Sequence, residues 1–89
     1  MERVRLRYTG RVQGVGFRAT VLSLAQGYPV TGWVRNDPDG SVTLEAQGAA
    51  ADVREFLEAV RSRMGRLVHS ADESPIALHE DESDFEIRR

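Results

Sequence analysis

Residues 10–18 (GRVQGVGFR) form a glycine-rich stretch that joins an alternating strand to the first helix-forming run. Glycine lets backbone N–H groups converge where a Cβ would obstruct them. The start of a helix adds unpaired N–H donors and the positive end of a helix dipole. Arg18, in the first turn of that helix, adds a planar fork of donors that suits a phosphate. The stretch therefore predicts a small anion-binding loop.

The residues on either side of this loop predict a strand and a helix. Before it, apolar residues alternate with Arg3, Arg5 and Arg7, which indicates a strand with one buried and one solvent-exposed face. After it, four apolar residues have the i, i+3, i+4, i+7 spacing of an amphipathic helix: Val21, Leu24, Ala25 and Tyr28. Gly27 and Pro29 mark the end of this helix.

A hairpin and a second helix follow. Residues 30–36 and 41–47 have the pattern of strands, and Asp37-Pro38-Asp39-Gly40 between them matches a type I turn. Residues 49–64 have apolar side chains at helical spacing, and Gly65 ends this helix.

The last part of the chain is less regular. Residues 67–74 suggest a strand of poor alternation, residues 75–82 a loop, and residues 84–88 a clean closing strand. The resulting order predicts a ferredoxin-like α/β (α+β) sandwich, in which two helices cover one face of an antiparallel sheet. It consists of a βαββαβ unit and a short C-terminal strand, and the course of residues 66–82 stays open.

Length and composition narrow the class of protein. The 89 residues suit one domain, 1–89, and the absence of cysteine excludes disulfides, thiolate nucleophiles and Cys-ligated zinc. No apolar run has the length of a signal or membrane segment. Without cysteine or such a run, the chain is expected to be cytoplasmic. Since it begins at Met1 and ends just after its last strand, we expect a free-standing domain, and a small, charged domain is expected to be a monomer.

Charge is distributed unevenly along the chain. Residues 1–36 contain six arginines and one acidic residue, a net charge of +5, whereas residues 37–89 contain six arginines and thirteen acidic residues, a net charge of −7. The basic half contains the glycine-rich loop, which suits an anionic ligand. The total of −2 argues against a nucleic-acid partner.

Two stretches resemble the signatures of the acylphosphatases: residues 10–18 (GRVQGVGFR) and residues 32–42 (GWVRNDPDGSV). Their order, the helix between them and the closing residues 85–88 (FEIR) also fit, so the resemblance covers nearly the whole chain. It implies an enzyme that hydrolyses small acyl phosphates to a carboxylate and inorganic phosphate, with no metal or other cofactor. The sequence does not select the acyl group.

The resemblance also implies roles for individual residues. Arg18 and Asn36 are the implied catalytic residues: Arg18 binds the phosphoryl group, and the side-chain amide of Asn36 holds the attacking water. The implied phosphate-binding residues, whose backbone N–H groups surround the phosphate, are Gln13, Gly14, Val15, Gly16 and Phe17, together with Arg18.

This chemistry is physically reasonable for such a site. A carboxylate leaving group needs no general acid near neutral pH. Phosphoryl transfer through a loose transition state depends mainly on positioning and charge stabilisation. An asparagine amide orients water without titrating. The group that accepts the proton of the water stays open.

Other functional classes fit the sequence less well. Residues 14–19 match a dinucleotide fingerprint, but that fingerprint follows a strand buried on both faces, and here the strand carries an arginine at every second position. An RNA-binding sandwich needs a cluster of aromatic residues on its sheet, which this acidic chain (pI about 5.6) lacks. The serious alternative is an acylphosphatase-like domain that binds phosphate or carbamoyl phosphate without turnover.

Several residues are expected to have ordinary structural roles. Phe17 is predicted to anchor the loop in the core, and Trp33 is as well explained by packing as by ligand contact. His69 and His79 are predicted surface residues, far from each other and from the motifs.

Overall fold

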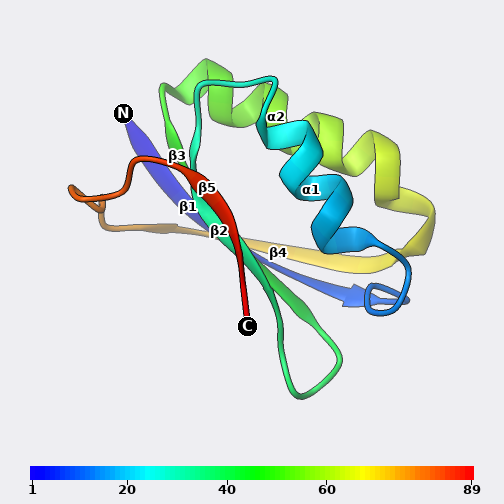
Figure 1. Ribbon diagram of the computed structural model, residues 1–89. Helices are drawn as coiled ribbons and strands as arrows, with labels where there is room; N and C mark the ends of the chain where they lie inside the picture. Colours follow the sequence, from blue (N-terminus) through cyan, green and yellow to red (C-terminus); the bar gives the residue numbers. More distant parts are fainter.

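The structure, a computed structural model, describes all 89 residues and shows two helices on one face of a five-stranded sheet (Figure 1). The elements follow in the order β1 (Glu2–Gly10), α1 (Phe17–Ala25), β2 (Thr31–Asn36), β3 (Val42–Gly48), α2 (Ala50–Met64), a 3₁₀ turn (Gly65–Leu67), β4 (Val68–Ile76) and β5 (Phe85–Arg88). The strands lie side by side in the order β4-β1-β3-β2-β5. The predicted ferredoxin-like sandwich is confirmed. Neither helix is long and apolar enough to cross a membrane.

The core lies between the sheet and the helices. In β1 and β3, alternate residues such as Leu6 and Leu44, which are paired in register, face the helices and are almost fully buried. Both helices contribute apolar side chains to the same cluster, with Phe56 of α2 completely buried. α1 ends at Ala25, earlier than expected, but Tyr28 still packs against the core.

β4 is longer than its sequence pattern suggested. It extends to Ile76, so Pro75 and Ile76, expected in a loop, pair instead with β1. Its side chains are mostly exposed, and its place in the sheet depends on the backbone ladder to β1. Pro75 is tolerated because β4 is an edge strand, where a missing N–H interrupts little.

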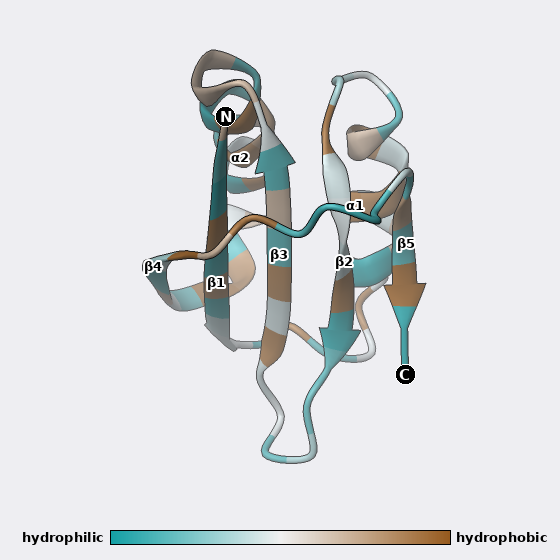
Figure 2. Ribbon diagram, turned by 90° about the vertical axis from the view of Figure 1, so that its left-hand side faces the viewer, coloured by the Kyte–Doolittle hydropathy of each residue, from teal (hydrophilic) through white to brown (hydrophobic).

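The expectation of a wholly antiparallel sheet is wrong for the last strand. β5 pairs with β2 in parallel, with Val34 opposite Ile87. The reason is the route of residues 77–84, which cross the open face of the sheet from β4 at one edge to β5 at the other (Figure 2). β4 runs opposite to β2, and the chain reverses once in crossing, so β5 runs in the direction of β2.

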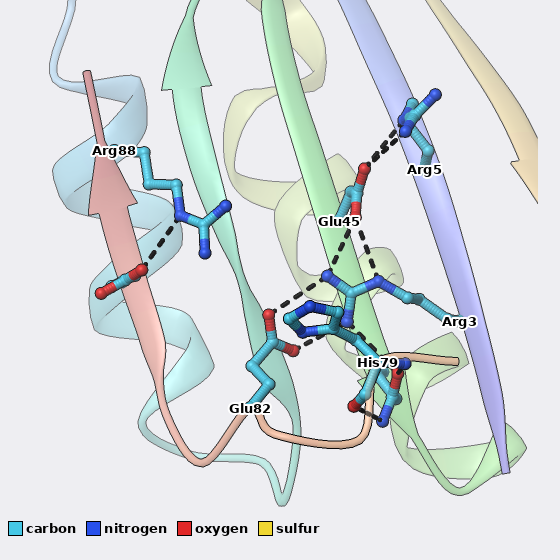
Figure 3. A network of polar contacts seen from close by, with 8 residues as sticks. Arg3, Arg5, Glu45, His79, Glu82 and Arg88 are labelled. Carbon is cyan, nitrogen blue, oxygen red and sulfur yellow. Dashed lines mark hydrogen bonds and ion pairs between the residues drawn. The ribbon is translucent and has the colours of Figure 1, made fainter. Parts of the chain in front are cut away.

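A buried ion network fastens this crossing segment to the sheet (Figure 3). The guanidinium of Arg3 donates to Glu45 Oε1 at 2.9 and 3.0 Å and to the two carboxylate oxygens of Glu82 at 2.7 and 3.1 Å. Arg3 is only 4% exposed, although its alternation predicted a solvent-exposed side chain. Arg5 binds the second oxygen of Glu45 at 2.9 Å. Each buried charge therefore has a partner, as the low-dielectric interior requires.

Glu82 remains a carboxylate in this environment. Burial raises the pKa of Glu82, but hydrogen bonds from Arg3 and Thr31 and the charge of Arg3 outweigh it, so the pKa lies below its ordinary value. The crossing segment is thus held by a charged contact whose strength depends on pH.

Replacing Glu82 with glutamine tests this contact. We expect Glu82→Gln to lower the free energy of unfolding at pH 7 by about 1 to 3 kcal/mol, because Arg3 loses one of its two carboxylate partners. Since the folded-state pKa is below 4.5, the extra stability is fully present above that value and is lost as the pH falls through the folded-state pKa. Urea unfolding of both proteins at pH 7 and at about pH 3 measures the difference.

Glu80→Gln is the matched control, because Glu80 lies in the same segment, is exposed and makes no ion pair. Equal unfolding free energies for the wild type and Glu82→Gln at pH 7 would contradict the role of the buried pair.

Candidate active site

The glycine-rich stretch forms a loop with free backbone donors, as predicted. Gly14 and Gly16 have φ angles of +75° and +79°, in the left-handed region that favours glycine. A Cβ would meet no atom within 4 Å at either position, so the constraint is the backbone angle rather than space. Gly16 precedes α1, and its carbonyl accepts the N–H of Thr20 at 2.9 Å. No N–H group from Gln13 to Phe17 donates to a backbone carbonyl. These donors are therefore available to a ligand.

A pocket of about 250 Å³ lies between this loop, the start of α1, the end of β2 and the C-terminal residues. Its lining residues are Val12, Gly14, Gly16, Phe17, Arg18, Ala19, Asn36, Ile87 and Arg89. The fold thus brings together Arg18 and Asn36, which are 18 residues apart in the sequence, next to the loop. Gln13 and Val15, also predicted to bind phosphate, do not line this pocket.

Arg18 differs from most arginines of the basic half. Arg3, Arg5, Arg7 and Arg35 each make an ion pair with an acidic side chain. Arg18 is half-buried in the pocket and makes no ion pair or side-chain hydrogen bond within the protein. Its guanidinium therefore keeps all its donors for an anion in the pocket.

Asn36 is the last residue of β2, and the turn after it is tightly held. The Gly40 N–H donates to the Asp37 carbonyl at 3.1 Å, as expected for the predicted turn. The Asp37 carboxylate accepts hydrogen bonds from Thr43 at 2.6 Å, Ser41 at 3.0 Å and Arg35 at 3.1 Å. Burial raises the pKa of Asp37, but these bonds outweigh it and the pKa is lowered. The backbone that carries Asn36 is consequently well ordered by its neighbours.

The side chain of Gln13 has a role that the sequence did not suggest. Its Nε2 donates to the carbonyl of Asp37 at 2.8 Å and to that of Ser41 at 2.9 Å. Gln13 therefore connects the loop to the β2–β3 turn, while its backbone N–H stays free in the loop.

The C-terminal residues were also missed. Ile87 and Arg89 form one wall of the pocket because β5 pairs with β2 beside Asn36. The closing strand was predicted, but its neighbour in the sheet was not. Pairing between strands so far apart in the chain leaves no local pattern in the sequence.

The remaining residues have structural positions. Phe17 is 2% exposed and packs against Tyr8 at a ring distance of 5.0 Å, which confirms it as a core anchor. Trp33 is buried, and the guanidinium groups of Arg35 and Arg88 lie over its ring, 4.8 and 5.1 Å from the ring centre. His69 and His79 are exposed, as predicted. No three His, Asp or Glu side chains are placed to hold a metal ion, and metal independence stays a prediction.

A larger groove of about 770 Å³ lies between α2 and β4. It contains Tyr8, Arg54 and Glu73 but neither Arg18 nor Asn36, and the free N–H groups of the loop do not line it. Arg54 is already bound to Glu2 and Glu73. The smaller pocket is therefore the better candidate for an anion site.

Comparison with known proteins identifies the family of this chain. The family model described as acylphosphatase matches residues 4–87. The chain belongs to the acylphosphatase family. Among its relatives, the acylphosphatase of Salinibacter ruber is 54% identical over 59 residues, which are 66% of this chain and 62% of that protein. The acylphosphatase of Pediococcus pentosaceus is 45% identical over 62 residues, 70% of this chain and 69% of that protein.

Solved structures show the same fold. The crystal structure of the Bacillus subtilis acylphosphatase superposes with a TM-score of 0.88 at 32% identity, and each chain is covered completely. Full-length HypF, crystallised in a phosphate- and nucleotide-bound form, superposes with a TM-score of 0.85, but at 23% identity and over 12% of its chain. That second likeness concerns the fold alone.

Replacing Gly16 tests the loop geometry. We expect Gly16→Ala to lower the free energy of unfolding by about 1 to 2 kcal/mol, because an L-residue is strained at a φ of +79°. We also expect inorganic phosphate to bind about tenfold more weakly, since the N–H groups no longer converge. Urea unfolding and isothermal titration with phosphate measure the two effects. Gly27→Ala is the control, because Gly27 lies outside the left-handed region; its unfolding free energy and its phosphate affinity should be nearly unchanged. Unaltered phosphate binding in Gly16→Ala would count against the loop as the anion site.

Proposed function

We propose that the protein hydrolyses small acyl phosphates to a carboxylate and inorganic phosphate in the pocket between the loop and β2. The observation that carries this proposal is that Arg18 and Asn36 line the same pocket, beside a row of free backbone N–H groups. Arg18 has no ion-pair or hydrogen-bond partner for its side chain within the protein. Family membership and the name of the relatives, acylphosphatase, support a hydrolase.

The phosphoryl group is the part of the substrate that the pocket is suited to hold. The free N–H groups from Gln13 to Phe17 surround its oxygens, and the guanidinium of Arg18 binds two of them. The left-handed glycines set the backbone of the loop before the substrate arrives, and the first turn of α1 places Arg18 beside it. Such preorganised donors stabilise the charge that develops on the phosphoryl oxygens in the transition state.

Asn36 positions the nucleophile, which is a water molecule. Its side-chain amide offers one acceptor and two donors, which suffices to orient a water molecule toward phosphorus. Asn36 belongs to β2 and not to the loop, so it can approach the phosphoryl group from a different side than Arg18. The leaving carboxylate is stable without a proton, so no general acid is required. We infer that the reaction needs no metal ion.

The same observations favour turnover over mere binding. A phosphate-binding domain needs the loop and Arg18 but has no use for a water-holding amide in the pocket.

The family match over residues 4–87 supports one domain, 1–89. We further propose that this domain acts as a monomer in the cytoplasm, on small molecules rather than on nucleic acid or membranes.

Hydrolysis of benzoyl phosphate by three proteins tests the proposal. We expect the wild type to turn over the substrate at equal rates with and without EDTA. Arg18→Ala should lower kcat/KM by about 10³-fold through loss of charge stabilisation. Asn36→Ala should lower kcat by about 10²-fold with little change in the inhibition constant of inorganic phosphate, because the water is misplaced while the phosphate donors remain.

Arg11→Ala is the matched control, because Arg11 lies at the start of the loop, outside residues 13–17, is exposed and does not line the pocket. A folded wild type that binds phosphate at Arg18 without hydrolysis would instead establish a phosphate- or carbamoyl phosphate-binding domain.

A further inference from the structure

We propose that Gln13 is a positioning residue, whose side-chain amide fixes the distance between the phosphate loop and Asn36. This inference rests on the function proposed above and adds a residue that acts on the reaction without touching the substrate. The resemblance implied that Gln13 binds phosphate through its backbone N–H; the role proposed here belongs to its side chain.

The amide of Gln13 bridges both arms of the β2–β3 hairpin. Its Nε2 lies 2.8 Å from the carbonyl oxygen of Asp37 and 2.9 Å from that of Ser41. A primary amide has two N–H donors, so each carbonyl receives one. The same two residues close the turn, since the Asp37 N–H donates to the Ser41 carbonyl at 2.8 Å. Gln13 therefore binds the hairpin at the point where its two strands separate.

The contact between Gln13 and Asp37 joins two residues that are each adjacent in the chain to a residue of the pocket lining. Gln13 precedes Gly14, and Asp37 follows Asn36; both Gly14 and Asn36 line the pocket. No other hydrogen bond joins residues 11–18 to residues 36–41. The relative position of the two halves of the site thus depends on this amide and on core packing below the loop.

The two halves differ in how firmly they are held. The hairpin end is a closely bonded unit, in which the Asp37 carboxylate joins Ser41, Thr43 and Arg35. The loop itself has few bonds: Arg11 N–H to the Leu67 carbonyl at 2.9 Å at its start and Thr20 N–H to the Gly16 carbonyl at its end. Between these points, the Gln13 side chain ties the loop to the rigid unit that carries Asn36.

The expected effect of losing this contact is larger on rate than on stability. Gln13 is exposed, and two neutral hydrogen bonds at an exposed side chain contribute modestly to folding. The reaction, however, requires the water and the phosphorus atom at near-attack distance, and a misplacement of about 1 Å costs up to 10²-fold in rate. Variants of Gln13 should therefore fold and still show an altered turnover.

Gln13→Met tests the proposal, because methionine has a similar length and shape but no donor. With benzoyl phosphate, we expect kcat to fall about tenfold or more. We expect the inhibition constant of inorganic phosphate to change less than about twofold, since the loop N–H groups and Arg18 remain. Gln26→Met is the matched control: Gln26 is exposed after α1 and makes no side-chain hydrogen bond, so its kcat should be unchanged.

A double variant separates positioning from a general effect on the loop. If Gln13 acts through Asn36, Gln13→Met should add almost no loss of kcat in the Asn36→Ala background. An equal loss in both backgrounds would overturn the proposal. An unchanged kcat in Gln13→Met would overturn it too. So would a rise in the phosphate inhibition constant of Gln13→Met large enough to explain its entire loss of activity.

The wild-type measurement in the same assay tests the proposed function separately. Should the wild type not turn over benzoyl phosphate, the bridge itself is measured by ¹⁵N relaxation of the free protein. Gln13→Met, and not Gln26→Met, should then lower the order parameters of the backbone amides of residues 13–17, because the loop loses its side-chain tie to the hairpin. Identical order parameters in all three proteins would overturn the bridge irrespective of activity.

Discussion

The buried guanidinium of Arg3 links parts of the chain that would otherwise be independent. It lies on the open face of β1 and needs acidic partners there, because an unpaired charge in that environment is strongly destabilising. One partner, Glu45, comes from the adjacent strand β3 and the other, Glu82, from the segment that crosses the sheet. By fixing that segment, Arg3 directs the last residues of the chain to the free edge of β2. The C-terminal wall of the pocket, Ile87 and Arg89, depends on this arrangement.

The pocket is built from three segments that meet only in the folded protein. The loop supplies N–H donors, β2 supplies Asn36, and β5 supplies a wall. The residues that line the pocket include no carboxyl or imidazole side chain that could transfer a proton. This suits a reaction with a good leaving group, for which the placement of donors and water matters more than proton transfer. A domain of 89 residues can achieve such placement because each segment is attached directly to the sheet.

The sequence predicted those parts of the fold and site that have a local cause. Left-handed glycines, an arginine in the first helical turn and the Asp37-Pro38-Asp39-Gly40 turn each leave a signal within a few residues. β4 has few apolar side chains and is held by its backbone, so its length had no side-chain pattern from which to be predicted. The burial of Arg3 depends on carboxylates 42 and 79 residues away, and the contact of Gln13 on carbonyls 24 and 28 residues away. Periodicity along the chain does not contain such information.

The charge asymmetry of the sequence has a structural explanation. Four arginines of the basic half find acidic partners, and every partner lies in the acidic half: Glu45 and Glu82 for Arg3, Glu45 for Arg5, Asp39 for Arg7 and Asp37 for Arg35. Folding therefore neutralises most of the positive charge that the first 36 residues carry. Arg18 is excluded from this neutralisation because it lies in the first turn of α1, beside the loop and away from the acidic side chains on the open face of the sheet. An uncompensated guanidinium beside free N–H groups attracts an anion, whereas a paired one would have to exchange its carboxylate first. The pairing of these four arginines thus leaves Arg18 in the pocket and the exposed Arg11 as the uncompensated arginines of the basic half.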